Sequence, residues 1–171
     1  MKKVVIITAQ GFQDEELIYP FYRLKEAGYE VDVATKDGNV VHGKYGVPAR
    51  TTISTPELKA ENYDAVILPG GFEAPDRVRV LPEVLDFVKK MYESNKLVAA
   101  ICHGPWIMIS AGITKDKKIT SYWSIEADVK NSGANYQHKV PVVIDGNIIT
   151  SPHYDFNGDF MREVVRYLEE H

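Results

Sequence analysis

The sequence predicts an α/β fold built on a mostly parallel sheet, and three observations lead to this prediction. Strand-like and helix-like patterns alternate along the chain, several strands are continuous apolar runs, and polar loops that contain glycine follow three of them. Such alternation is typical of parallel strands joined by helices, in a sheet that is covered on both faces. No repeat or linker divides the 171 residues, so we expect residues 1–171 to form one domain.

The first strand and helix have the clearest patterns. Val4–Thr8 is an apolar run, and Asp14–Ala27 repeats apolar residues on one helical face before Gly28 ends it. Pro20 lies inside this helix, where the missing N–H and the ring predict a kink. Tyr29–Thr35 alternates between apolar and polar residues and predicts the second strand.

The middle of the chain combines irregular and regular segments. Val40–Ile53 carries glycines and a proline among β-branched residues, which predicts irregular or hairpin-like strands at a sheet edge. Thr55–Glu57 has Pro at the first helical position and predicts a short helix. Tyr63–Leu68 and Lys96–Ile101 have the patterns of buried strands, and Pro82–Glu93 between them that of an amphipathic helix.

The last third continues the alternation. Asp145-Gly146 between two β-branched runs predicts a hairpin, and Ser124 predicts a helix N-cap. We expect a helix over Gly104–Ala111, ended by Gly112, then a short strand over Lys118–Tyr122 and a capped helix from Ser124 to about Gly133. The two hairpin strands would be Val140–Ile144 and Asn147–Ser151, and Asp159–Glu170 would form the closing helix.

Composition excludes several classes of function. The 20 basic and 24 acidic residues give a net charge of −4, which argues against a nucleic-acid partner. No apolar run approaches the roughly 20 residues that span a bilayer, so we expect no membrane partner and a cytoplasmic protein. The one cysteine, Cys102, cannot form an internal disulfide, and no paired histidine spacing accompanies it. We therefore expect no metal and no cofactor.

Two of the three loops at strand ends carry weak signals. Residues 9–16 lack the glycine patterns of dinucleotide and nucleotide triphosphate sites, which disfavours both. Pro69-Gly70-Gly71 could direct backbone N–H groups at a ligand, although the motif alone favours an ordinary turn.

The third loop is the most informative, because a buried strand runs directly into Cys102-His103-Gly104-Pro105. A thiol at a sharp turn before a helix lies where backbone N–H groups favour an anion, so we expect a lowered pKa for Cys102. Gly104 permits the close backbone approach of a strained nucleophile elbow, and His103 is a candidate base if the turn brings the two side chains together. Alternatively, Cys102 is a small core residue.

At these motifs the sequence resembles the ThiJ/PfpI superfamily, and within it the PfpI intracellular protease branch. The resemblance implies a class I glutamine amidotransferase-like fold, which is a flavodoxin-like three-layer α/β/α sandwich. It covers nearly the whole chain, and its strongest stretches are Phe12–Pro20, Leu68–Gly71 with Ala74–Arg79, Ala100–Pro105 and Thr120–Tyr122.

The resemblance also implies roles for individual residues. Cys102 would be the nucleophile, and Glu16 a partly protonated carboxylic acid whose pKa is raised beside the thiolate. His103 would be the base, and the acid of the triad would come from a neighbouring subunit at the position of Asp76. The backbone N–H groups of Gly71 and His103 would form the oxyanion hole.

The sequence departs from the branch at two places. Asp76 stands where the branch usually has Glu, which shortens the reach by roughly 1.5 Å. Ser151–Asp155 replaces the usual Ser-Arg-x-Pro-x-Asp run and brings His153 near the site. With Gly70 and Tyr122, His153 is therefore a candidate pocket residue.

Simpler interpretations of several of these residues remain open. Glu16 could be a solvated residue at the polar boundary of its helix, and Asp76 could form a surface salt-bridge cluster with Arg77 and Arg79. Tyr122 could be a core or interface aromatic residue instead of a pocket residue.

The resemblance implies a cysteine hydrolase that acts on peptides or on carbonyl-modified amino groups, as a peptidase or a deglycase. Glyoxalase activity on small 2-oxoaldehydes is an alternative. Another is a non-catalytic stress protein or chaperone that senses peroxide through an acidic, accessible Cys102. Because the triad acid would come from a neighbour, we expect a homo-oligomer, from dimer to hexamer.

Overall fold

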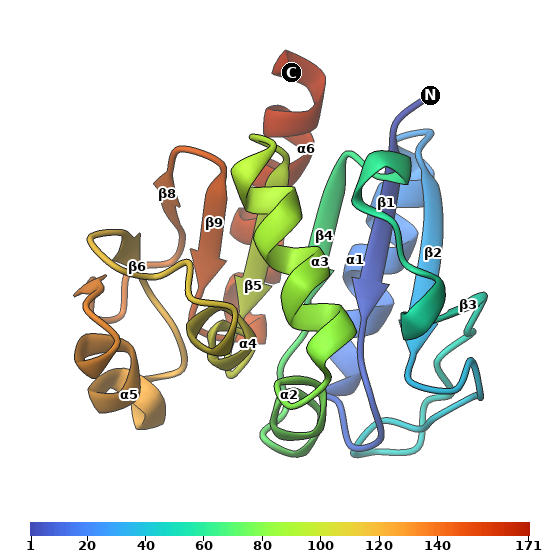
Figure 1. Ribbon diagram of the computed structural model, residues 1–171, viewed down its shortest axis with the longest axis horizontal. Coiled ribbons are helices and arrows are strands. Elements are labelled where there is room, and N and C mark those ends of the chain that lie inside the picture. Colours follow the sequence, from blue (N-terminus) through green and yellow to red (C-terminus); the bar gives the residue numbers. More distant parts are fainter.

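The computed structural model describes residues 1–171 as a seven-stranded sheet between helices (Figure 1). Its strands follow the order β3-β2-β1-β4-β5-β9-β8, and all neighbours are parallel except β8 and β9. A separate pair of short parallel strands, β6 and β7, lies beside the sheet. The strand bounds are β1 Lys3–Ile7, β2 Glu30–Thr35, β3 Ile53–Ser54, β4 Ala65–Leu68, β5 Leu97–Ile101, β6 Lys118–Ile119, β7 Asn135–Tyr136, β8 Val143–Asp145 and β9 Ile148–Ser151.

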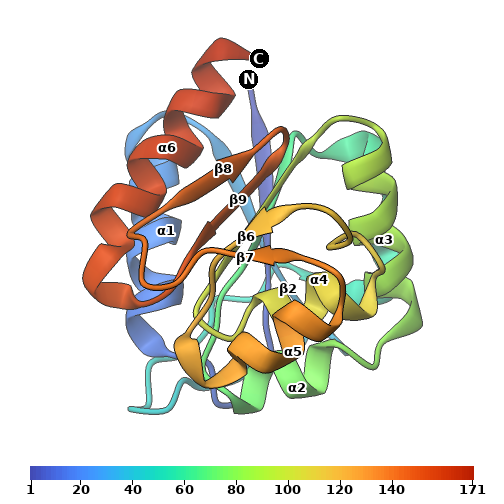
Figure 2. The same ribbon diagram turned by 90° about the vertical axis from the view of Figure 1, so that its left-hand side faces the viewer.

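Helices cover both faces of the sheet. Figure 2 shows α1 and α6 on one side and α3 on the other. The helix bounds are α1 Asp14–Glu26, α2 Glu73–Val78, α3 Pro82–Glu93, α4 Pro105–Ser110, α5 Glu126–Asn131 and α6 Asn157–Glu170. This arrangement is the predicted three-layer α/β/α sandwich.

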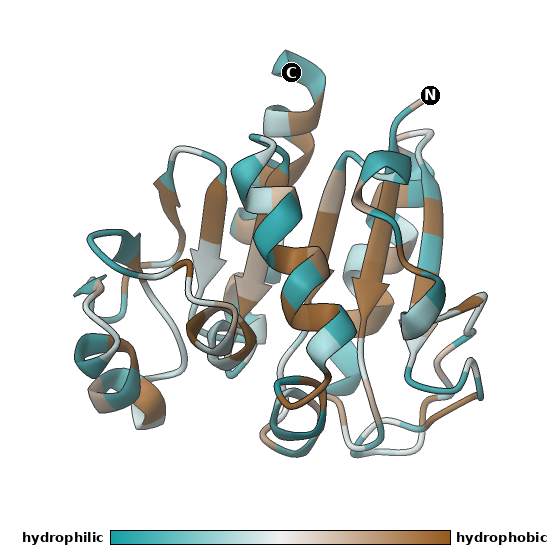
Figure 3. Cartoon of the chain, viewed as in Figure 1, coloured by the Kyte–Doolittle hydropathy of each residue, from teal (hydrophilic) through white to brown (hydrophobic).

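Alternate residues of each central strand face opposite layers of the core. In β1, Val5 and Ile7 pack with the α3 side, whereas Val4 and Ile6 pack with α1 and α6. Figure 3 shows most of β1 in hydrophobic colours, while α3 is banded, as a helix with one buried face should be. The continuous apolar strands of the sequence therefore correspond to burial on both faces.

Most of the predicted helices and strands are present. The differences lie mainly in segments whose strand length depends on pairing with distant parts of the chain. Lys118–Tyr122 forms a strand over only two residues, because β6 pairs only with the equally short β7, which the sequence did not predict. In Val40–Ile53 the predicted hairpin reduces to one isolated bridge, between His42 and Pro48, and Ile53 begins the edge strand β3. Helix α1 continues through Pro20 to Glu26, and α2 was not predicted.

The prediction that Ser124 caps a helix is wrong. Trp123–Ile125 forms a 3₁₀ turn, and Ile125 occupies the N-cap position of α5. The Ser124 hydroxyl instead contacts the imidazole of His103, 21 residues earlier in the chain. None of the helices is both long enough and apolar enough to cross a membrane.

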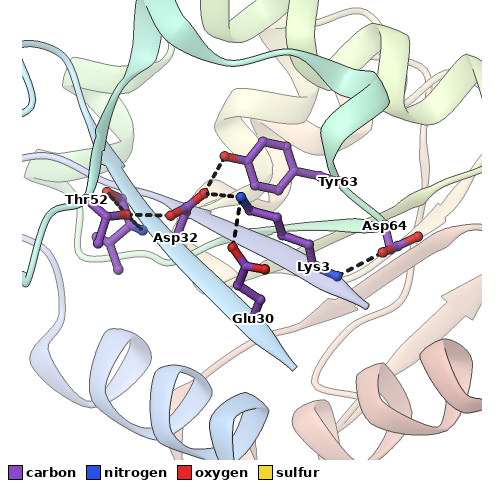
Figure 4. A network of polar contacts seen from close by, with 7 residues as sticks. Lys3, Glu30, Asp32, Thr52, Tyr63 and Asp64 are labelled. Atoms are coloured by element: carbon purple, nitrogen blue, oxygen red, sulfur yellow. Dashed lines mark hydrogen bonds and ion pairs between the residues drawn. The ribbon is translucent and has the colours of Figure 1, made fainter. Parts of the chain in front are cut away.

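A polar network joins the amino ends of β1, β2 and β4, opposite the edge where the candidate site lies (Figure 4). The ammonium of Lys3 pairs with Glu30 at 3.0 Å and with Asp32 at 3.2 Å. The backbone N–H of Lys3 donates to the Asp64 carboxylate at 2.8 Å. These contacts hold three adjacent strands in register at their starting points.

We expect Asp32→Asn to destabilise the fold. Burial raises the pKa of Asp32, but hydrogen bonds from Tyr63 (2.6 Å) and Thr52 (2.8 Å) and the ion pair with Lys3 outweigh it, so the pKa lies below its usual value. A lowered carboxyl pKa stabilises the folded state above the unfolded pKa, and this contribution is lost on acidification. The variant should lose about 1–2 kcal/mol in urea unfolding at pH 7 and less at pH 3; an equal loss at both pH values would contradict the ionic origin.

Candidate active site

Cys102 occupies a strained elbow between β5 and α4. Its φ is +63°, a left-handed conformation that is uncommon for a residue other than glycine. Two backbone hydrogen bonds hold it there: its N–H donates to Ser151 at 2.9 Å, and its carbonyl accepts from Tyr122 at 2.8 Å. A side chain at position 104 would collide with the carbonyl oxygen of Leu68, so Gly104 allows α4 to start against β4. The strained turn that the sequence predicts is therefore present.

The elbow brings backbone N–H groups and an imidazole close to the sulfur. The Cys102 side chain is buried, and the backbone N–H groups of Gly71 and His103 both donate toward its sulfur. The Nδ1 atom of His103 lies 3.2 Å from Sγ. With the positive φ at Cys102, the side chains of Cys102 and His103 do come together, although the two residues are adjacent in the sequence.

Glu16 reaches this cluster from the first turn of α1. It is 0% exposed, and its Oε1 accepts a 2.8 Å hydrogen bond from the N–H of Gly70. Its Oε2 has no partner that meets strict hydrogen-bond geometry, yet the carboxyl lies close enough to Cys102 for each group to shift the pKa of the other. The alternative of a solvated Glu16 is therefore wrong.

Burial controls the charge of Glu16. It raises the pKa of this carboxyl to about 8, against the opposing hydrogen bond from Gly70. At neutral pH the carboxyl is therefore mostly protonated, and it can donate a hydrogen bond to a neighbouring thiolate instead of repelling it.

We expect Glu16→Gln to remove the loss of stability that wild type undergoes as the pH rises toward 8. A folded-state pKa of about 8, above the usual 4.5, gives stability that is complete below pH 4.5 and is lost as the pH rises to about 8. Between pH 6.5 and pH 8 wild type should lose about 2 kcal/mol more than the variant, whose amide does not titrate. Urea unfolding of both proteins at these pH values measures the difference, and parallel curves would contradict the expectation.

The pKa of Cys102 is shifted in the direction opposite to the sequence prediction. Burial raises it, Glu16 adds to the rise when its carboxyl is ionised, and the N–H groups of Gly71 and His103 oppose it without overcoming it. The sequence indicated the turn and the helix start but not the depth of burial. Burial therefore favours the neutral form of the thiol, in contrast to the lowered pKa that the turn motif predicts.

His103 is held among aromatic rings. Its ring stacks on Tyr122 at 5.2 Å between centroids and meets the edge of Trp106 at 5.0 Å. Burial, followed by the charge of Lys44, lowers its pKa to about 4, so the imidazole is neutral at neutral pH. While Nδ1 faces the thiol, Nε2 lies 3.3 Å from the Ser124 hydroxyl.

Asp76 lies apart from these groups within one chain. It is exposed on α2, and its carboxylate has no ion-pair or hydrogen-bond partner. The alternative of a salt-bridge cluster with Arg77 and Arg79 is also wrong, because Arg77 pairs with Glu73 at 3.0 Å and Arg79 donates to Ser110.

A cavity of about 440 Å³ opens above the thiol. Of the predicted residues, Gly71, Cys102, His103, Tyr122 and His153 line it, whereas Gly70 lies beneath and binds Glu16. Six further lining residues were not predicted from the sequence, and they come from loops far apart in the chain. They are Gln13, Lys44, Tyr45, Phe72, Ser124 and Tyr154.

One signal could have identified two of the missed residues. Gly43 and Gly46 flank Lys44 and Tyr45 in the segment that was interpreted as irregular edge strands. Because β2 lies next to β1 in the sheet, the loop after β2 opens on the same edge as the loop after β1.

Comparison with known proteins gives consistent results. Residues 2–167 match the DJ-1/PfpI family. The protein named Deglycase PfpI from Pyrococcus furiosus is 41% identical over 167 residues, which cover 98% of this chain and 99% of that protein. A deglycase from Thermococcus kodakarensis is 45% identical over 166 residues, covering 97% and 99% of the two chains.

A solved structure shares the fold. It is a two-domain protein from Anabaena variabilis that contains a DJ-1/ThiJ/PfpI-like and a ferritin-like domain, with a TM-score of 0.96 and 37% identity. The match covers 99% of this chain and 48% of that one, so this chain spans about half of its length. By the family match, the identity to these relatives and the shared fold, the chain belongs to the DJ-1/PfpI family.

Proposed function

We propose that the chain is a cysteine-dependent hydrolase of the PfpI type, acting on carbonyl-modified amino groups or on peptides. The observation that carries this proposal is the convergence on one sulfur of the His103 imidazole and two backbone N–H groups. The names of the two archaeal relatives, both deglycases, support it. Rates on a peptide, a glycated amine and methylglyoxal, measured side by side on one preparation, test it.

The reaction would begin with proton transfer from Cys102 to His103. As Sγ bonds to the carbonyl carbon, Nδ1 of the neutral imidazole takes the thiol proton and the carbonyl π pair moves to oxygen. We propose that the N–H groups of Gly71 and His103, which lie within hydrogen-bonding reach of the sulfur, also hold that oxygen. For an amide, collapse breaks the C–N bond, the nitrogen takes the proton from His103, and water hydrolyses the thioester. Peptidase, deglycase and glyoxalase activities share the initial attack.

Glu16 would support the nucleophile without taking part in bond making. Its protonated carboxyl adds no negative charge beside the sulfur and can donate a hydrogen bond to it once the thiol ionises. The hydrogen bond from Gly70 fixes Oε1, which leaves Oε2 to carry the proton.

Two groups are candidates to bind Nε2 of His103, the ring nitrogen that faces away from the thiol. Asp76 of a second copy would supply an acid, as the family resemblance implies, whereas Ser124 already contacts Nε2 at 3.3 Å within the chain. If Nε2–H donates to the Ser124 hydroxyl, Nδ1 is left as the acceptor that faces the thiol. We propose that Ser124 fixes this tautomer.

We expect Ser124→Ala to lower kcat by about three- to tenfold with little change in KM, because a weaker hold on His103 affects proton transfer more than binding. Asp76→Asn is the matched variant: unchanged kcat would exclude an acid from a neighbour, and a comparable loss would support one. Light scattering at micromolar concentration tests the homo-oligomer that we propose, and a monomer would exclude Asp76 directly. Unchanged kcat in Ser124→Ala would contradict the role of Ser124.

The peroxide-sensor alternative receives less support from the geometry. A sensor thiol should be acidic and accessible, whereas Cys102 is only 7% exposed and burial raises the pKa of its thiol. The cavity above it suits a small carbonyl compound or a single modified side chain.

A further inference from the structure

Outside the lining, Asp155 lies 3.4 Å from His153, but the fixed charge that lines the cavity is one-sided. Its eleven lining residues include one fixed cation, Lys44, and no carboxylate, although the chain carries more acidic than basic residues. The neutral lining groups include the amide of Gln13 and the hydroxyls of Tyr45, Ser124 and Tyr154, all of which can donate hydrogen bonds. Such a lining favours a ligand that carries negative charge.

Lys44 stands on a loop that is firmly attached to α1. The buried carboxylate of Asp14 accepts hydrogen bonds from the N–H groups of Tyr45 at 2.9 Å and Val47 at 3.0 Å. The N–H of Lys44 donates to the carbonyl of Phe12 at 2.8 Å. Asp14 lies two residues before Glu16, so the same helix end fixes the loop and the carboxyl beneath the nucleophile.

The ammonium group of Lys44 is available to a ligand. It forms no ion pair with a carboxylate, and it lies 5.6 Å from the ring centroid of the exposed Phe72 at the cavity wall. Its charge also lowers the pKa values of Glu16 and His103, so its field reaches the reacting groups.

We propose that the site prefers carbonyl compounds that carry a carboxylate, and that Lys44, positioned by Asp14, binds that carboxylate. This inference rests on the proposed function for the reacting carbonyl. The anion-binding part stands on the cavity lining alone and is tested separately.

Binding of an inert pair of ligands isolates the charge. Calorimetry should show phenylacetate binding wild type about fivefold more tightly than phenylacetamide, as expected for a partly exposed ion pair. The preference should disappear in Lys44→Met and weaken with added salt. It should persist in the control Lys139→Met, since Lys139 lies over Trp123 at 5.0 Å but does not line the cavity. Equal binding of both ligands to wild type, or a preference retained without Lys44, would overturn the proposal.

A kinetic comparison separates this inference from the proposed function. Wild type should show a roughly fivefold higher kcat/KM for 4-carboxyphenylglyoxal than for phenylglyoxal, and Lys44→Met should lose this advantage. Turnover of both compounds at equal efficiency would overturn the carboxylate preference and leave the proposed function, whose hydrolase reactions are tested on the peptide and the glycated amine. Selective phenylacetate binding without turnover of the two glyoxals, the peptide or the glycated amine would support the anion site and contradict the catalytic proposal.

Gly43→Ala tests whether position matters as well as charge. A side chain there would approach the Asp14 carboxylate atoms to 2.5–2.6 Å, and that carboxylate cannot move without releasing the loop. The variant retains Lys44 but should lose most of the phenylacetate preference, with folding checked by its urea midpoint. A folded variant with the full preference would overturn the positioning role of Asp14.

Discussion

Cys102→Ala is expected to reduce turnover of a peptide, a glycated amine and methylglyoxal together, by at least about a thousandfold where wild type is active. The reason is that His103 and the N–H groups of Gly71 and His103 converge on the sulfur, and without it no covalent step remains. Initial rates on all three substrates measure the effect.

Cys102→Ser is the control for shape, because it keeps a hydroxyl in the same elbow. It should fold like wild type and remain almost inactive, since an alcohol is a far weaker nucleophile beside an imidazole whose pKa is about 4. Activity that survives in Cys102→Ala on any one substrate would remove that reaction from the proposed function.

Gly104→Ala is expected to have the largest effect on stability. The added Cβ would collide with the carbonyl oxygen of Leu68 and approach that of Ile101 to 2.9 Å. Both are backbone atoms at the ends of central strands, so neither can rotate away. We expect a loss of at least about 3 kcal/mol in urea unfolding, or no soluble protein.

Gly158→Ala provides the control for this substitution. It places the same methyl group in α6, where nothing lies within 4 Å of the added carbon. It should leave stability unchanged or raise it by up to about 1 kcal/mol, because alanine favours the helix. Wild-type stability in Gly104→Ala would contradict the tight contact between β4 and α4.

The parts of the site that local patterns encode could be predicted from the sequence. The buried strand that runs into Cys102-His103-Gly104 indicated the elbow, and the family resemblance added Glu16 and Gly71. Each of these residues lies at or near the carboxyl end of a central strand, so the topology of a parallel sheet was sufficient to bring them together.

Features that depend on contacts between distant segments could not be predicted. Ser124 has the residue type of a helix cap, and only the path of the chain after β6 directs it to His103. Asp14 has the charge typical of a first helical turn, yet it binds a loop about 30 residues away. The pKa of Cys102 depends on how completely its neighbours exclude water, which the turn motif does not specify.

The buried Glu16 limits the range of alkalinity in which this protein can work. Raising the pH favours the thiolate of Cys102, but it also removes the proton that allows a carboxyl to remain buried beside that sulfur. Chemical activation and structural integrity therefore depend on pH in opposite ways. On the alkaline side the lifetime of the folded protein, and not the supply of thiolate, should end the proposed activity.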